Sequence, residues 1–468
     1  MKMVYNVKDK PPFGKMLVYA LQQMLAILAA TIAVPAIIGN GMSQAAALFG
    51  AGVGTLVYQL FTKFKSPVFL GSSFAFLGSM AAAFAGGVSM QLGYLGLIIG
   101  AAFAGLVYVI IALIVKKCGS GWVNKLMPAV VIGPTVAIIG LSLAGNAIGD
   151  LVGHVAQDSN GNYIMNLNGG ISLVCGLVTL FATVAASVYG GKNIKLIPFI
   201  IGIAAGYIVA TIFTLIGTAA NVGALKVIDF TKFQNMQWLP DFTFIEAFKG
   251  VKEVDGAYIG TIAVAYVPVA FVVFAEHIAD HKNLSSIIES DLLEEGNPGL
   301  DRTLLGDGVG SMAGAFFGGC PNTTYGESVG CVAITGNASV ATITTTAIVC
   351  IAAAFVAPFV TLLATIPGCV MGGVCVALYG FIAVSGLKMV QKVDLEDNGN
   401  LFTVSAILIA GIGGLSLKFG QITITEIACA LILGILVNVF CRAFKKKEEK
   451  AETVTATEED KATEEENK

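Results

Sequence analysis

The chain has 468 residues, of which 56% are hydrophobic and only 12% are charged, and its mean hydropathy is +0.82. Because one soluble core cannot bury this many apolar side chains, the composition excludes an ordinary soluble protein and indicates a polytopic membrane protein. The net charge of −3 mixes basic loops with an acidic tail, and it gives no indication of a nucleic-acid partner.

The two ends of the chain are charged. Residues 1–15 are basic and lead into an apolar stretch without a small-residue cleavage site, so we expect a retained first span and a cytoplasmic N-terminus instead of a cleaved signal peptide. The segment 442–468 ends the chain, and from Lys445 onward it consists almost entirely of Lys, Glu, Thr, Ala and Asp. A segment of this composition cannot fold alone, so we expect a disordered cytoplasmic tail.

Windows of about twenty residues predict fourteen membrane spans between these ends. Two of them, the third and the tenth, are too short for a complete crossing. In chain order the predicted spans are 16–37, 45–61, 67–80, 88–115, 126–147, 168–190, 196–217, 257–279, 303–317, 325–336, 339–357, 366–387, 400–416 and 423–441.

The positions of Lys and Arg indicate the orientation. With the N-terminus on the cytoplasmic side, 22 of the 27 basic residues fall in inner segments and five fall in outer segments. Basic residues gather on the cytoplasmic side of membrane proteins, so both termini are expected in the cytoplasm of a multi-pass protein of the cell membrane.

The short spans hold corresponding places in two sets of seven. Both short segments are interrupted by polar or small residues, and the first span of each set carries a proline, Pro35 or Pro268. Because seven is an odd number of crossings, the second set of seven spans must be inverted in the membrane relative to the first. Paired broken segments of this kind indicate a midplane site in a secondary transporter. The alternative is that the Gly-rich segments only allow neighbouring helices to pack closely.

The string PNTTYGESVGCVAITG (321–336) leads into and includes the tenth segment, and it has one carboxylate, Glu327. Backbone that leaves a helix at membrane depth is tolerated where it is buried or lines a cavity. Thr324 and Glu327 also match a capping box, in which Thr324 is the N-cap and Glu327 folds back onto it. A helix that starts at the midplane would in addition present free N–H groups to a ligand.

Glu276 and Asp280 are the other candidate carboxylates. Glu276 follows a charge-free run from Gly256 to Ala275, and Asp280 lies on the same helical face. Twenty uncharged residues already span the hydrocarbon, so one interpretation makes Glu276 part of an interfacial polar end. A tilted or longer helix would instead bring it into the interior, where ionisable residues are usually functional.

These residue types favour a particular ligand chemistry. Two carboxylates, backbone amides and aromatic rings, with no Lys or Arg inside any predicted span, favour a neutral ligand with N–H donors over an anion. Desolvation disfavours a charged carboxylate, so such a group can carry a proton and link transport to a proton gradient. We therefore expect the proton as coupling ion and no cofactor.

Metal chemistry and enzymatic catalysis are not indicated. The nine Cys lie mostly in apolar runs, without a CxxC pair or a His at ligand spacing. No Ser/His/Asp or metal constellation stands at useful spacing, so we expect no metal site and no enzyme.

Three strings carry a family resemblance: FAEHIADHKNL (274–284), 299–336 with its NTTYGE motif, and IPGCVMGGVCVALYGFIAVSG (366–386). They resemble the nucleobase–ascorbate transporter family, and its bacterial uracil permease branch in particular. The resemblance implies an all-α polytopic membrane protein of two inverted seven-span repeats, with short strands in the discontinuous spans 3 and 10. It also implies a core domain (16–117 and 257–360), a gate domain (122–217 and 366–441), and an extracytoplasmic loop at 218–256.

The resemblance also implies roles for individual residues. Substrate contacts would come from Glu276, Glu327, Phe74, Tyr325, Gly326 and Tyr379. Proton coupling would involve Glu276, Asp280 and His281. Asp280 stands where some uracil permeases have a His, and Ser328 stands where the family signature usually has Asn.

Several alternatives stay open at this point. The first reading is import of uracil by proton symport through alternating access between core and gate. A xanthine or purine permease of the same family is the alternative, and an anion exchanger of the same fold is a further one. The resemblance also suggests a homodimer in the lipid bilayer.

Overall fold

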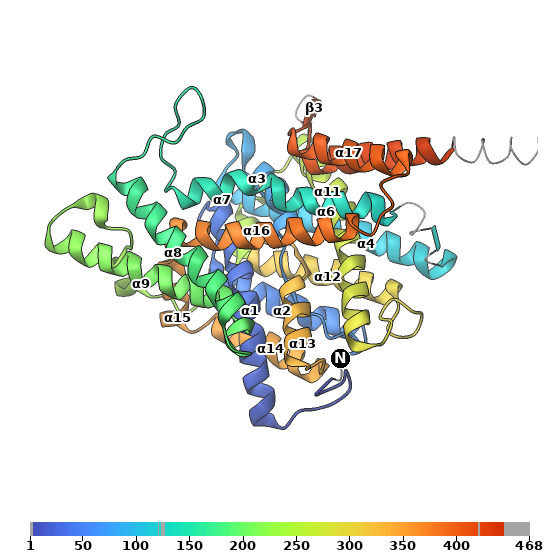
Figure 1. Ribbon diagram of the computed structural model, residues 1–468, viewed down its shortest axis with the longest axis horizontal. Coiled ribbons are helices and arrows are strands. Elements are labelled where there is room, and N and C mark those ends of the chain that lie inside the picture. Colours follow the sequence, from blue (N-terminus) through green and yellow to red (C-terminus); the bar gives the residue numbers. More distant parts are fainter. Residues whose placement is uncertain (1–2, 120, 123–126, 420–421, 444–468) are drawn as a thin grey trace, which may run out of the picture.

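A computed structural model describes residues 3–119, 121–122, 127–419 and 422–443 of the chain (Figure 1). The predicted tail at 442–468 lies outside the described residues except for its first two positions. The main elements are α1 (Phe13–Ile38), α2 (Gln44–Phe61), β1 (Leu70–Ser72), η1 (Phe74–Phe76), α3 (Leu77–Ala83), α4 (Met90–Cys118), α6 (Ala129–Ser142), α7 (Ala144–Leu151), α8 (Leu167–Tyr189), η3 (Ile194–Leu196), α9 (Pro198–Ala219), α10 (Thr243–Ala247), α11 (Gly256–Ile288), α12 (Leu300–Gly318), β2 (Asn322–Thr324), α13 (Gly326–Thr335), α14 (Val340–Ala353), α15 (Ala357–Ala364), α16 (Gly368–Val390), α17 (Asn398–Ile412), β3 (Leu417–Phe419), β4 (Ile422–Ile424) and a last helix, Glu426–Ala443.

Each of the fourteen predicted segments contains at least one of these helices. Among the residues that the structure describes, nine helices are long and apolar enough to cross a membrane, or ten if the bent pair α14 and α15 counts as one span. The chain is therefore a multi-pass membrane protein, and the number of crossings stays a prediction. One segment ends in a break, where α14 meets α15 at 84°, whereas α6 and α7 together form one apolar span, Ala129–Leu151, as predicted.

The helices pack in two groups. One group contains α1, α2, α4, α11, α12 and α14, on which η1, α3 and α13 pack, and the other contains α6, α7, α8, α9, α16 and α17. Corresponding helices of the two halves make corresponding contacts. In the first group α2 packs on α14 and its counterpart α12 packs on α4, while α1 packs on α14 and its counterpart α11 packs on α4. In the second group α8 packs on α16, and its counterpart α17 packs on α6. Exchanging the two halves of the chain reproduces the same neighbours, as the predicted repeat requires.

Spans 3 and 10 meet at a short antiparallel ladder. β1 pairs with β2 in the register Leu70 with Thr324, Gly71 with Thr323 and Ser72 with Asn322. Helical turns follow both strands, η1 and α3 after β1 and α13 after β2. The predicted arrangement of a strand followed by a half-helix is confirmed in both segments. All six paired strand residues are buried, so each strand satisfies the polar backbone of the other away from water.

Close contact between α2 and α12 holds this ladder in place. A side chain at Gly54 would meet the carbonyl of Gly310 at 2.7 Å and the amide of Asn322 at 2.5 Å. The Asn322 amide instead donates to the carbonyl of Gly50 (3.0 Å). Small residues let the two backbones approach, and β2 is thereby tied to α2.

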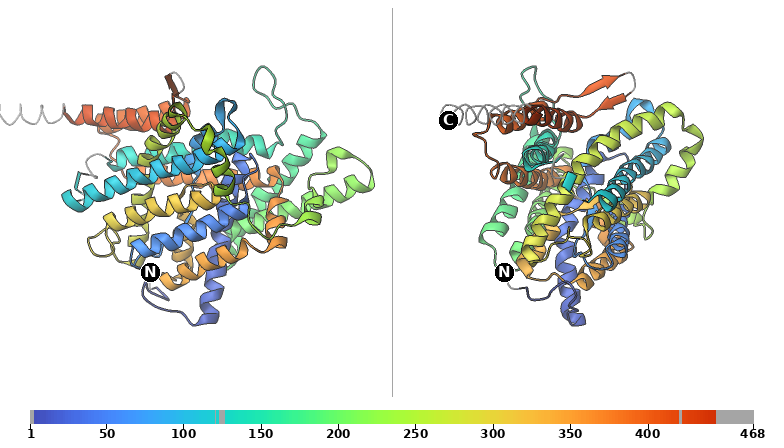
Figure 2. Two further views of the ribbon diagram at one scale, coloured as in Figure 1. Left: turned by 180° about the vertical axis from the view of Figure 1, so that it is seen from behind. Right: turned by 90° about the vertical axis from the view of Figure 1, so that its right-hand side faces the viewer.

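The hairpin of β3 and β4 was not predicted. Leu417 pairs with Ile424 in an antiparallel ladder, and the hairpin leaves the bundle between α17 and the last helix (Figure 2). β4 contacts α11, so the connection between the last two helices reaches back to the first packing group.

Candidate functional site

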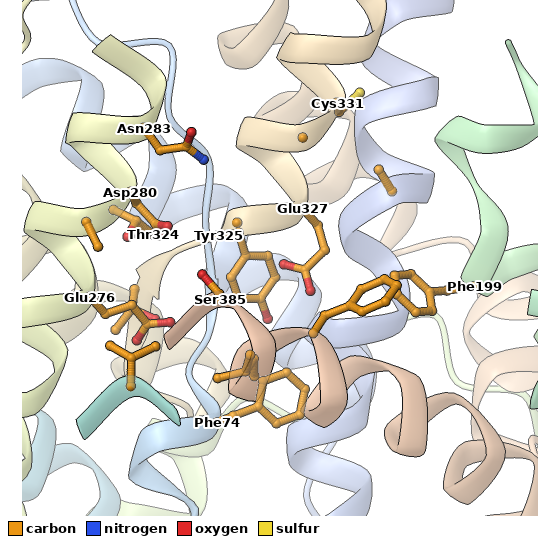
Figure 3. Close-up of a pocket in the computed structure, with 18 of the residues that line it drawn as sticks. Phe74, Phe199, Glu276, Asp280, Asn283, Thr324, Tyr325, Glu327, Cys331 and Ser385 are labelled. Carbon is orange, nitrogen blue, oxygen red and sulfur yellow. Dashed lines mark hydrogen bonds between the residues drawn. The ribbon is translucent and has the colours of Figure 1, made fainter. Parts of the chain in front are cut away.

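A cavity of about 380 Å³ lies where the two packing groups meet (Figure 3). The first group supplies residues of α1, η1, α11 and α13, and the second supplies residues of α6, α8, α9 and α16. β2 and the residues that follow it complete the wall. The broken tenth span therefore lines a cavity, which answers why a polar, helix-breaking string stands in an apolar sequence.

Three carboxylates face this cavity. Glu276 and Asp280 come from one face of α11, four residues apart, and Glu327 comes from the first turn of α13. Figure 3 shows the carboxylates of Glu276 and Glu327 pointing into the same space from these two helices. The three groups are near enough to interact electrostatically. α11 continues for three turns beyond Glu276 to Ile288, and Glu276 lines the cavity, which favours the interpretation that places it inside the protein.

Asp280 is hydrogen-bonded to the strand. The Thr324 hydroxyl donates to Asp280 Oδ2 over 2.6 Å, which ties α11 to β2. The capping box predicted for Thr324 and Glu327 is therefore wrong, because Thr324 lies in the β ladder and its hydroxyl points toward α11. The residue before α13 is Tyr325, and it makes no side-chain capping hydrogen bond.

The start of α13 is consequently left open toward the cavity. The first N–H groups of a helix have no partner within the helix, and here no cap side chain takes them. Gly326 and Glu327 line the cavity at this point. The site thus offers backbone donors beside carboxylate acceptors, with the positive end of the helix dipole between them.

Two predicted aromatic residues line the cavity, and a third lies behind it. Phe74 and Tyr325 are buried and face the cavity. The Tyr325 hydroxyl donates to the carbonyl of Ser72 (2.7 Å), and its ring occupies the space that a side chain at Gly71 would take. Tyr379 is not among the lining residues; its ring packs edge-on against Phe74 with the centroids 5.4 Å apart.

His281 does not face the cavity. It is fully buried, with Nδ1 2.8 Å from the carbonyl of His277 and Nε2 2.7 Å from the Tyr58 hydroxyl. His277 is equally buried, and its Nδ1 lies 2.7 Å from Asp307 Oδ2 of α12. The reason is helical geometry: one step along a helix turns a side chain by about 100°, so residues that follow Glu276 and Asp280 point toward α2 and α12.

Sequence reasoning missed several residues of the site. Asn283, Phe199 and Ser385 line the cavity, and Lys195 of η3 lies at its exposed end. The buried Asp307 was missed too, although an ionisable residue in a predicted span is itself a signal of function. For Phe199 and Ser385 the sequence offers no such signal, because an aromatic or small residue near a span end is ordinary.

A second cavity, of about 540 Å³, adjoins the first. Its wall includes Asn40, Asn146 and Glu426. Phe74 and Ala75 line both cavities, so the start of η1 is the partition between them.

Comparison with known proteins gives the family. The sequence profile of the Permease family matches residues 14–418. The chain belongs to the nucleobase–ascorbate transporter family. It is 38% identical over 444 residues to a uracil permease of Bacillus caldolyticus, which covers 94% of each chain. It is 36% identical over 456 residues to a uracil permease of Bacillus subtilis (strain 168), covering 97% of this chain and 98% of the relative.

Solved structures support the fold of this family member. The transmembrane domain of the cyanobacterial bicarbonate transporter BicA superposes with a TM-score of 0.58 at 15% identity, covering 91% of this chain and 96% of that domain. The murine anion transporter Slc26a9 in its inward-facing state gives 0.62 at 12% identity, covering 94% of this chain and 69% of the other. The family member therefore shares the core and gate fold of these transporters, and at this identity the likeness extends to the fold alone.

Proposed function

We propose that the protein imports uracil by proton symport, with the base bound in the 380 Å³ cavity. One observation carries the proposal: two carboxylates on different helices and the uncapped start of α13 face a single cavity between the two packing groups. The names of relatives that match nearly the whole chain point to the same substrate.

The hydrogen-bonding groups of uracil complement this cavity. Uracil has two N–H donors and two carbonyl acceptors on a flat ring. Ionised Glu276 and Glu327 can only accept hydrogen bonds, so they suit the two donors. The N–H groups at the uncapped start of α13 suit a carbonyl, and the rings of Phe74 and Tyr325 provide apolar surface for the base.

The carboxylates also suggest how protons are coupled to transport. Three carboxylates in one buried cavity disfavour ionisation of all three at once, so one of them can hold the coupling proton while the others accept the N–H groups of uracil. We propose that Glu276 and Asp280 exchange the coupling proton. His281 lies behind the cavity, so a role for it would act through His277 and α11 rather than by contact with the substrate.

The two cavities suit alternating access. With both termini in the cytoplasm, the exposed Lys195 end of the site cavity faces inward and the 540 Å³ cavity faces outward. Phe74 belongs to the first packing group and Tyr379 to the second, so their contact closes the outward path. Movement of one group against the other would separate them and expose the site on the other side.

The test is uracil binding by purified protein carrying Glu276→Gln or Glu327→Gln. Each change replaces a charged acceptor by a neutral amide, so we expect affinity to fall about 10- to 100-fold, the effect of a hydrogen bond to a charged group. The control is Glu246→Gln, because the Glu246 carboxylate pairs with Lys249 and both side chains are exposed. Wild-type affinity in both site variants would refute the proposed binding mode, and tighter binding of xanthine than of uracil would move the substrate to the purines.

A further inference from the structure

The first described residues of the chain are fastened to the protein by backbone hydrogen bonds. The N–H groups of Val4 and Tyr5 donate to the carbonyl of Gly336, at 2.7 and 3.2 Å. In return, Ala338 N–H donates to the Tyr5 carbonyl (2.9 Å) and Val340 N–H donates to the Val7 carbonyl (3.1 Å). Residues 3–9 thus lie along residues 336–340 in the manner of a parallel bridge, and we call them the strap. Figure 1 shows the N-terminal end beside α13 and α14.

Side chains add to this attachment. The Ser339 hydroxyl donates to the carbonyl of Asp9 (2.6 Å). Met3 and Val7 pack against a buried cluster that includes Val329 and Val332 of α13. The strap therefore holds both the back of α13 and the turn that follows it.

The position of the strap relative to the site follows from the two faces of α13. Glu327, Gly330 and Cys331 line the cavity, whereas Val329 and Val332 face the cluster behind it. α13 has only ten residues, or about 15 Å of helix. A displacement at its end near Gly336 is consequently carried to Glu327 at its start.

α13 also needs such support more than an ordinary span does. Its start is uncapped and faces the cavity, and its end is a left-handed glycine, Gly336, with φ 69°. A Cβ atom at Gly336 would lie 3.2 Å from Cγ2 of Val4, so any larger residue there would crowd the strap. The backbone after the helix then finds its partners in the strap.

We propose that residues 3–9 position α13, and that they thereby set the affinity of the site through Glu327. The strap makes no contact with the cavity, so its residues are positioning residues. The effect on affinity rests on the proposed function, whereas the effect on α13 does not. Loss of hydrogen bonds from the strap reduces the fraction of molecules in which Glu327 has the position that binds the ligand, and the apparent affinity for the ligand falls in proportion to that fraction.

The test compares Val4→Pro with Val4→Ala in the full-length protein. Proline removes the N–H that donates to Gly336, whereas alanine keeps it and loses only a side chain that is 57% exposed. We expect Val4→Pro to weaken uracil binding about fivefold, the effect of one ordinary hydrogen bond. Val4→Ala should bind as the wild type does.

A second readout does not depend on uracil. Cys331 lies on the cavity face of α13, and its alkylation by N-ethylmaleimide can be followed by peptide mass spectrometry. Faster alkylation of Cys331 in Val4→Pro than in Val4→Ala supports the strap, even if the wild type binds no uracil and the proposed function fails. Equal alkylation rates and equal affinities in the two variants overturn it.

Hydrogen exchange of the wild-type protein tests the strap without any variant. The strap predicts that the amide hydrogens of Val4, Tyr5, Ala338 and Val340 exchange slowly, because each donates to a backbone carbonyl. Exchange of all four at the rate of a free peptide overturns the proposal.

Discussion

At the scale of single residues, the three carboxylates of the cavity differ in their surroundings. Asp280 accepts a hydrogen bond from Thr324, whereas no side chain of another described residue donates to Glu276 or Glu327. The two glutamates therefore have carboxylate oxygens that no side chain of another described residue occupies. Asp280 instead joins α11 to β2, so it couples the position of one half of the site to that of the other.

This role of Asp280 gives a prediction for Thr324, which is 1% exposed. Thr324→Val keeps the shape of the side chain and removes the donor, so we expect the free energy of unfolding to fall by about 1–3 kcal/mol. Thr324→Ser retains a hydroxyl and should recover most of that loss. Thermal unfolding of the purified proteins measures both, and an unchanged unfolding temperature in Thr324→Val would mean that the hydrogen bond does not stabilise the fold.

At the scale of elements, the sequence predicted the broken spans well, since a polar string such as NTTYGE cannot lie in lipid as free backbone. It could not predict what each side chain of the string contacts. Thr324 matched a local capping pattern, but pairing of β2 with β1, about 250 residues earlier, directs it toward Asp280. The strap could not be predicted from the sequence for a similar reason, because its hydrogen bonds join residues more than 300 positions apart.

The contact of α2 with α12 gives a prediction at the same scale. Gly54→Ala places a methyl group against the backbone of Gly310, which cannot move aside as a side chain could. We expect a loss of about 1–3 kcal/mol of stability, seen as a lower unfolding temperature. Gly260→Ala is the matched control, because nothing lies within 4 Å of the added atom. Equal unfolding temperatures would show that α2 and α12 can separate without cost.

At the scale of the whole molecule, the matched contacts of the two halves place a cavity on each side of Phe74. One thin partition between two cavities is what an alternating-access transporter requires, because only a small barrier then has to open. The sequence indicated two halves and a midplane site. The partition itself depends on the Phe74 and Tyr379 rings, which are brought together from spans 3 and 12.

The partition predicts different effects for two changes of Tyr379. Tyr379→Ala removes the ring that supports Phe74, so we expect lower accumulation of substrate and a proton leak in proteoliposomes. Tyr379→Phe keeps the ring that packs against Phe74 and removes only the hydroxyl, so accumulation should stay close to that of the wild type. Full accumulation without a leak in Tyr379→Ala would exclude this pair as the barrier.

The central claim is that the cavity carries uracil together with a proton. Its most direct test is uptake of labelled uracil into proteoliposomes, with and without an inward proton gradient, in the presence of unlabelled uracil or xanthine. We predict uptake above the external concentration only with the gradient, with competition by uracil and none by xanthine. Uptake that is indifferent to the gradient and to protonophore would contradict proton symport, and absence of uracil uptake would contradict the substrate.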